Sequence, residues 1–284
     1  MKKYIVLIVS ILLPFMAFGQ AQIDTKKVKI GDFTQKITKI VLTGNQFHDA
    51  SLKSEVTAKW HVSPFEFCTL KEFEELKGDD NYYFLLTTKG QFKRETEPGL
   101  MFLTLVKGGK NSSNGLDNML EIVALPYASA EDPSGREMLF MPVFLDIIQN
   151  YALDSMDKDV NAYVGLPNYS LNISKSGGMT LVFSEGDLSA EITPEVRDAC
   201  FDKDVLVLSE EDADTYMEPS RTNTLVSYVA VPTEAKAGSY CYKMMIDPQT
   251  SILYYFRRHR ISKAVGPGFL AEDIKRITAP RKKK

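Results

Sequence analysis

Apolar residues along this chain follow short strand-like and helix-like patterns that alternate in a fixed order. Between residues 65 and 86 the pattern predicts a strand at Phe65–Cys68, a helix, and a second strand at Tyr82–Leu86. Thr69 and Glu72 have the spacing of a capping box, in which each side chain satisfies a free amide at a helix start, so the helix is expected from Leu70. The continuous aromatic and aliphatic run of the second strand is typical of a buried strand.

The rest of the first half supplies three strands and two helices. Asp49 predicts the N-terminal cap of a helix whose apolar face ends at Trp60, the only tryptophan, which is expected in the core. Pro142 would damage a helix interior but suits a first helical position, so the last helix is expected to start there. The three strands are Ile37–Leu42, Leu100–Val106 and Met119–Leu125.

The second half repeats this order of elements. Its strands are Met179–Phe183, Val205–Leu208, Leu225–Val231, Tyr240–Ile246 and Ile252–Phe256, and its helices start after Thr193, after Ser209 and at Phe269. Seven elements start 133 to 144 residues after their counterparts; Val205, for example, follows Phe65 by 140. The sequence therefore predicts an α/β fold with α+β mixed sheets, built as two tandem, duplicated β-α-β-α-β-β-β-α units. The alternative is a single mixed α/β domain with an unrelated second half.

The N-terminus has the pattern of a secretory signal peptide. Lys2 and Lys3 precede the apolar run Tyr4–Phe18, and cleavage after Gly19 or Ala21 suits the small-residue rule. A membrane anchor is the rival interpretation, but the run is shorter than the ~20 residues that span hydrocarbon. The expected organisation is a signal peptide at 1–21, an arm at 22–36, a first unit at 37–156, a linker at 157–178, a second unit at 179–277 and a basic tail at 278–284.

Composition is that of an ordinary globular protein, with 25% charged and 44% hydrophobic residues. The three cysteines Cys68, Cys200 and Cys241 cannot all pair, which excludes a disulfide scaffold and favours buried thiols. Nucleic acid is not an expected partner, because the sequence pI is about 5.8 and no aromatic-basic binding motif occurs.

Three stretches resemble uncharacterised exported proteins of the Bacteroides type: the signal end Ala17–Gln20, the segment Ser63–Cys68 and the segment Leu253–Arg260. The resemblance implies export and no particular activity. The alternating order of strands and helices also looks like the small modules of TolB-like and LpoB-like envelope proteins, an analogy of arrangement that carries no function.

Motifs for the common catalytic chemistries do not occur in the sequence. There is no Gly-x-Ser-x-Gly turn and no His-Glu-x-x-His helix, and His48, His61 and His259 are isolated. Asp157–Asn168 imitates the start of a calcium loop but lacks the sixth-position glycine and the last-position glutamate, so a solvated loop is expected. We therefore assign no catalytic residue, no metal ligand and no cofactor, although His48 beside Asp49 could act as an oriented base.

Charge is segregated along the chain. Residues 185–218 contain twelve acids against two bases, whereas residues 257–284 contain ten bases against two acids. Arg257, Arg258 and Arg260 are thus a candidate interaction surface, with Arg258 and Arg260 on the strand face opposite His259. The simpler interpretation of this segregated charge is that both segments form solvated faces and that the chain ends in a basic tail.

Together these patterns favour an exported, non-enzymatic binding or assembly protein of the cell envelope, periplasmic or surface-associated. Its partner is unknown: an envelope protein, an anionic envelope component or a second copy of the chain would each fit. No transmembrane segment is expected after signal removal. The alternative is an envelope hydrolase whose catalytic residues come together only in the fold.

Overall fold

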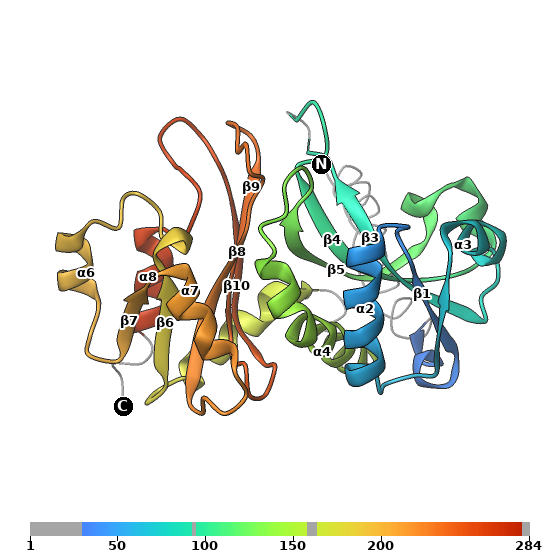
Figure 1. The fold of residues 1–284 in the computed structure, drawn as a ribbon, viewed down its shortest axis with the longest axis horizontal. Helices are drawn as coiled ribbons and strands as arrows, with labels where there is room; N and C mark the ends of the chain where they lie inside the picture. Colours follow the sequence, from blue (N-terminus) through green and yellow to red (C-terminus); the bar gives the residue numbers. More distant parts are fainter. Residues whose placement is uncertain (1–29, 93–94, 158–163, 280–284) are drawn as a thin grey trace, which may run out of the picture.

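Two five-stranded mixed sheets stand side by side in the computed structural model, which describes residues 30–92, 95–157 and 164–279 (Figure 1). The first unit contains η1 (Phe33–Gln35), β1 (Ile37–Val41), α2 (Gln46–Lys59), β2 (Phe65–Cys68), α3 (Leu70–Leu76), β3 (Tyr82–Gly90), β4 (Leu100–Lys107), η2 (Lys110–Asn114), η3 (Leu116–Asn118), β5 (Leu120–Ser129) and α4 (Arg136–Asp157). The second contains η4 (Leu166–Lys175), β6 (Thr180–Ser184), η5 (Glu185–Asp187), α6 (Pro194–Cys200), β7 (Val205–Leu208), α7 (Glu210–Asp214), η6 (Thr215–Met217), β8 (Thr224–Ala230), β9 (Tyr240–Ile246), β10 (Leu253–Arg260) and α8 (Ala271–Thr278).

The two sheets have the same topology. The strand order is β2-β1-β3-β4-β5 in the first and β7-β6-β8-β9-β10 in the second. In each, the three strands linked by helices pair in parallel and the last three form an antiparallel meander. The predicted α/β fold with mixed sheets and two tandem units is confirmed.

Local sequence signals set several boundaries. The capping box is present: the Thr69 hydroxyl accepts the Glu72 amide and the Glu72 carboxylate accepts the Thr69 amide, so α3 starts at Leu70 as predicted. The helix expected to be capped by Asp49 is instead capped by Asn45, whose side chain accepts the amides of residues 47 and 48. The predicted cap was wrong because Asp49, in the first turn, binds the amides of the preceding turn.

The helix expected to start at Pro142 starts at Arg136, six residues earlier. Pro142 removes one backbone donor from the second turn, yet the helix continues because Phe140 and Met141 on this turn are fully buried. Ser134 accepts the Arg136 amide, and this bond caps the true start.

One hydrophobic core joins the two units. α2 and α4 cover one face of the first sheet, and residues of β8, β9 and β10 belong to the same buried cluster as residues of α4. The opposite face of the first sheet is closed in part by Phe73 of α3, and that of the second sheet by α6 and α8. α4 therefore serves both units, as its place between the sheets in Figure 1 shows.

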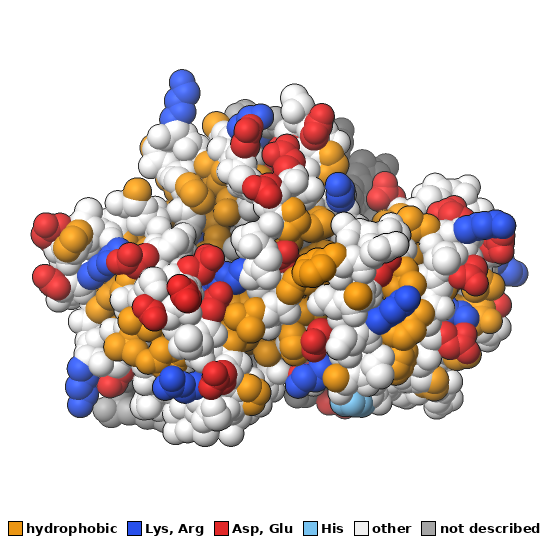
Figure 2. All heavy atoms as spheres, in the orientation of Figure 1, with side chains coloured by type: hydrophobic (Ala, Val, Ile, Leu, Met, Phe, Trp, Pro, Cys, Tyr) orange, Lys and Arg blue, Asp and Glu red, His pale blue; other side chains and the backbone are white. Residues whose placement is uncertain are grey.

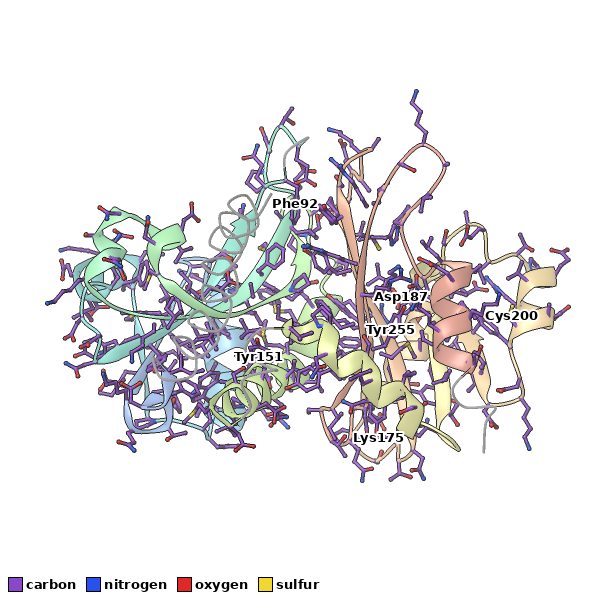
Figure 3. All side chains as sticks on the ribbon, turned by 180° about the vertical axis from the view of Figure 1, so that it is seen from behind. Phe92, Tyr151, Lys175, Asp187, Cys200 and Tyr255 are labelled. Carbon is purple, nitrogen blue, oxygen red and sulfur yellow. The ribbon has the colours of Figure 1, made fainter. Side chains whose placement is uncertain are left out.

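The N-terminal arm and the connection between the two units also pack against the two sheets. From residue 30 the expected arm lies against the first unit, with Ile30 and Phe33 buried. In the expected linker, η4 lies along β10, where the Ser170 hydroxyl bonds the backbone of Phe256; Figure 3 shows this side, with Lys175 at the end of η4. The signal peptide, residues 22–29 of the arm, residues 158–163 of the calcium-like loop and residues 280–284 of the tail lie outside the described residues. Within the described ranges, no helix combines the length and apolarity needed to span a membrane.

Candidate functional site

A cavity of about 590 Å³, here called pocket A, opens at the carboxyl ends of the parallel strands of the first unit. β1 lies between β2 and β3, so the connections from β1 to β2 and from β2 to β3 run in opposite directions across the sheet. Open α/β sheets bind ligands at such a switch point. Residues from the ends of β1 and β3, the starts of α2, α3, β4 and α4, and the segment after β5 line pocket A. They include Thr43, His48, Leu70, Thr87, Met101 and Glu137.

Exposed apolar side chains rim pocket A. Phe47 is 78% exposed and Leu70, the first residue of α3, is 54% exposed. Figure 2 shows hydrophobic side chains gathered on the face of the molecule where α2 approaches the junction of the two units. Large apolar groups held in water beside a cavity are typical of binding surfaces.

The turn between β1 and α2 is built to hold one wall of pocket A. Gly44 has a φ of +87°, a left-handed conformation that suits glycine. The Asp49 carboxylate accepts the amides of Thr43 and Gly44 at 2.8 and 2.9 Å, together with the Thr43 hydroxyl. Burial alone raises the pKa of Asp49, but these hydrogen bonds outweigh it and lower that pKa. Asp49 is therefore a structural anion.

His48 lies between Asp49 and Tyr127. Its Nε2 is 3.2 Å from the Tyr127 hydroxyl, whereas its buried Nδ1 is 3.7 Å from Asp49 Oδ1 and has no hydrogen-bond partner among the described residues. Burial raises the pKa of Tyr127 to about 12, so its phenol stays protonated at neutral pH. The trio thus lacks the base-to-carboxylate hydrogen bond that orients a catalytic histidine.

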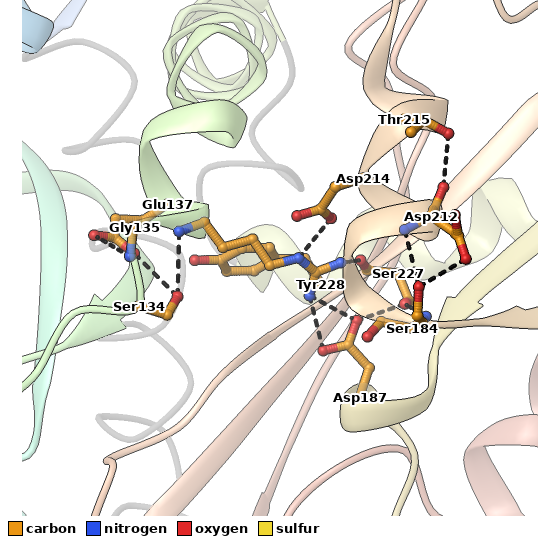
Figure 4. A network of polar contacts seen from close by, with 12 residues as sticks. Ser134, Gly135, Glu137, Ser184, Asp187, Asp212, Asp214, Thr215, Ser227 and Tyr228 are labelled. Atoms are coloured by element: carbon orange, nitrogen blue, oxygen red, sulfur yellow. Dashed lines mark hydrogen bonds and ion pairs between the residues drawn. The ribbon is translucent and has the colours of Figure 1, made fainter.

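Glu137, on the first turn of α4, lies at the inner side of pocket A and is 2% exposed. Its carboxylate accepts the Gly135 amide at 3.0 and 3.2 Å, and the Ser134 hydroxyl at 3.4 Å (Figure 4). Among the described residues, no lysine, arginine or histidine nitrogen lies within 4.0 Å of it.

Arg136, the neighbour of Glu137, points the other way and enters the second unit. Its guanidinium donates to Asp214 at 2.7 Å, to both oxygens of Asp187 at 3.0 Å and to the Ser227 carbonyl at 3.1 Å (Figure 4). It also stacks over Tyr228, with 5.4 Å to the ring centre. Burial raises the pKa of Asp214, although the charge of Arg136 opposes the shift. We call this group the Arg136 clamp.

The Arg136 clamp occupies the place in the second unit that corresponds to pocket A. A cavity of only about 190 Å³, pocket B, remains there. Glu210, the first residue of α7, takes in pocket B the place that Leu70 has in pocket A. The segment Ser129–Glu137 of the first unit closes pocket B, and the Leu188–Phe269 bridge joins the turn after β6 to the segment before α8. One copy of the site is open and the other is filled by the chain itself.

A second buried ionic group lies on the far side of the second sheet. Lys243 and Asp273, both fully buried, form an ion pair, and the Tyr255 hydroxyl donates to Asp273 at 2.6 Å. Asp273 also accepts the amide of Leu270 and so caps α8. Figure 3 shows Tyr255 inside this unit. Burial raises the pKa of Asp273, but the charge of Lys243 and these hydrogen bonds outweigh it, so that the pKa is lowered.

The three arginines of the candidate interaction surface make different contacts at the end of β10. Arg257 pairs with Glu272 at 2.8 Å and Asp273 at 3.2 Å on α8. Arg258 lies over the Tyr240 ring, 5.0 Å from its centre, and Arg260 donates to the Gly238 carbonyl. Arg257 is thus engaged within the second unit, while Arg258 and Arg260 are exposed.

The remaining sequence candidates do not gather into one site. His48 lies at pocket A, whereas His259 Nε2 donates to the Gly266 carbonyl in the second unit. Cys68 and Cys241 are buried and all three thiols are free. In the described ranges, no group of three or more His, Cys, Asp or Glu side chains is placed to hold a metal ion.

Sequence reasoning missed Arg136 and Glu137. The partners of Arg136 are 51 to 91 positions away and Glu137 lines a cavity, and no local pattern reports either relation. A usable signal was present: Ser134 and Glu137 have the Ser-x-x-Glu spacing of a helix start before an apolar run.

Comparison of the chain with protein-family models, with curated proteins and with solved structures finds no match.

Proposed function

We propose that this protein is an exported, non-enzymatic binding protein of the cell envelope and that pocket A is its binding site. The observation that carries the proposal is the difference between the two copies of one site: pocket A is open and rimmed by exposed Phe47 and Leu70, while pocket B is filled by Arg136. Ligands with an apolar body of modest size fit the volume and lining of pocket A.

Hydrolysis is the weaker candidate for pocket A. The lining includes His48 but neither serine nor cysteine, and the Thr43 hydroxyl already donates to Asp49. A general base needs a nucleophile or water held within about 3.2 Å. A purified sample that cleaves esters, peptides or glycans, with activity lost in His48→Ala, would favour the hydrolase instead.

Binding is tested by titrating the chain from residue 22 onward with a neutral apolar fluorophore, N-phenyl-1-naphthylamine. We expect saturable binding that weakens about tenfold in the double variant Phe47→Ser/Leu70→Ser, because both apolar rim groups are lost. Leu171→Ser is the matched control, since Leu171 is 72% exposed on η4 and lies outside pocket A. Binding that is absent, or that is lost in the control alone, contradicts the proposal.

Export is tested on its own. The full chain, expressed in a Gram-negative host, is expected in the periplasmic fraction with a new N-terminus after Gly19 or Ala21. Retention of Lys2 and Lys3 on the mature protein would contradict export, whatever pocket A binds.

A further inference from the structure

The buried carboxylate of Glu137 indicates the charge of the ligand. This inference rests on the proposed function, because it concerns the same pocket A. A carboxylate at 2% exposure has lost most of its hydration, and folded proteins compensate such groups with hydrogen bonds and a counter-charge. Glu137 has the hydrogen bonds, from Gly135 and Ser134, but no cation among the described residues.

The other buried acids among the described residues fall into two groups, because Asp49 and Asp247 are held by backbone amides and hydroxyls, whereas Asp187 and Asp273 have cations. Asp187 holds Arg136 and Asp273 holds Lys243. Of these five buried acids, Glu137 is the one that lines pocket A. The missing counter-charge and the empty space therefore occur at one place.

An anionic ligand is disfavoured at the same place. The start of α2 would attract an anion through free amides, but the amides of Phe47 and His48 are already bonded to Asn45. Glu137 is the acid in the lining of pocket A, and Lys89, the lysine in the lining, is exposed at the rim.

We propose that pocket A binds a primary ammonium carried on an apolar body, with the ammonium paired to Glu137 and the apolar body against the Leu70 and Met101 side of the lining. The ammonium belongs to a free amine or to the N-terminus of a peptide. An ammonium donates three hydrogen bonds, and it is a small cation that can pair with a carboxylate in the lining of a cavity.

The test compares three ligands of one shape, phenethylammonium, 2-phenylethanol and phenylacetate, by calorimetry or by displacement of the neutral fluorophore. We expect phenethylammonium to bind at least about tenfold more tightly than the alcohol, and phenylacetate to bind most weakly. Glu137→Gln should remove the preference, because the amide keeps an oxygen for the Gly135 amide but has no charge. Glu131→Gln, an exposed acid that carries the same change in charge, should leave it intact.

The outcomes separate the two proposals. Equal affinity for the ammonium and the alcohol, or a preference that survives Glu137→Gln, overturns the ammonium site and leaves pocket A as a neutral site. Fluorophore binding without displacement by phenethylammonium overturns it too, and no binding of any probe overturns both proposals. If Glu137→Gln fails to fold, the order of the three ligands on the unaltered protein still decides. A phenylalanyl-alanine amide with and without an N-acetyl group distinguishes a peptide N-terminus from a free amine, since only the free N-terminus is charged.

Discussion

Removing the guanidinium of Arg136 should destabilise the whole molecule. Arg136 belongs to the first unit by sequence, yet it donates to two acids and one carbonyl of the second. Its side chain is 5% exposed, and Asp187 beside it is equally buried. Arg136→Ala would leave Asp187 with the Ser227 hydroxyl as its remaining hydrogen-bond donor and with no counter-charge.

The size of the loss follows from this geometry. Deleting one partner of a buried ion pair costs about 3–5 kcal/mol, because the other charge stays buried and uncompensated. Arg136 serves both Asp187 and Asp214, so we expect the upper half of that range. A single domain has a total stability of about 5–15 kcal/mol, and the variant should therefore be folded only marginally.

Urea unfolding of the chain from residue 22 measures the effect, followed by far-UV circular dichroism and tyrosine fluorescence. Arg197→Ala is the matched control, because its exposed pair with Glu185 should contribute less than about 1 kcal/mol. Adding Asp187→Asn and Asp214→Asn to Arg136→Met should recover much of the loss, since no buried charge then remains unpaired. A loss in Arg136→Ala no larger than in Arg197→Ala would refute the reasoning.

Three further predictions concern stability. Thr69→Ala removes one half of the capping box and should lower the free energy of unfolding by about 1 kcal/mol in urea; no change would mean that the cap is not needed. Because the folded-state pKa of Asp273 is lowered, its contribution to stability is present above about pH 4, its ordinary range, and is lost as the pH falls through the lowered value. Unfolding free energies measured from about pH 6 down to about pH 2 should thus fall less steeply in Asp273→Asn than in the unaltered protein, and parallel curves would contradict this. Gly268→Ala should cost more than Gly178→Ala: both have positive φ, but a Cβ at 268 would meet backbone nitrogen at 2.6 Å while 178 faces open space. Equal melting temperatures for these two variants would contradict the close approach.

The order of elements was predictable because each signal lies within a few residues. The capping box at Thr69 and the mostly apolar run Tyr240–Ile246 place α3 and β9 at their observed bounds. The start of α4 was missed because Pro142 is a strong local signal, whereas burial of Phe140 against the second sheet is a tertiary effect. Likewise Leu70 has helical spacing with Phe73 and Leu76, but only the fold shows that it faces a cavity.

The candidate site was beyond the reach of sequence reasoning. Pocket A joins β1, β3 and the start of α4, and its lining spans 97 positions of the sequence, from residue 41 to residue 138. His48 drew attention as a histidine beside an acid, and it does line pocket A. The spacing of Ser134 and Glu137 indicated only a helix start, because a missing counter-charge is a property of the surroundings and not of the residue.

The shared core around α4 has a consequence for how this protein can be divided. A domain with a hydrophobic core of its own can in principle fold alone. Here Tyr228, Met244 and Phe256 of the later half bury themselves with the helix that closes the earlier one. Dividing the chain between the two units would expose that apolar face of the second sheet to water. The two units are therefore expected to fold together, as one cooperative body.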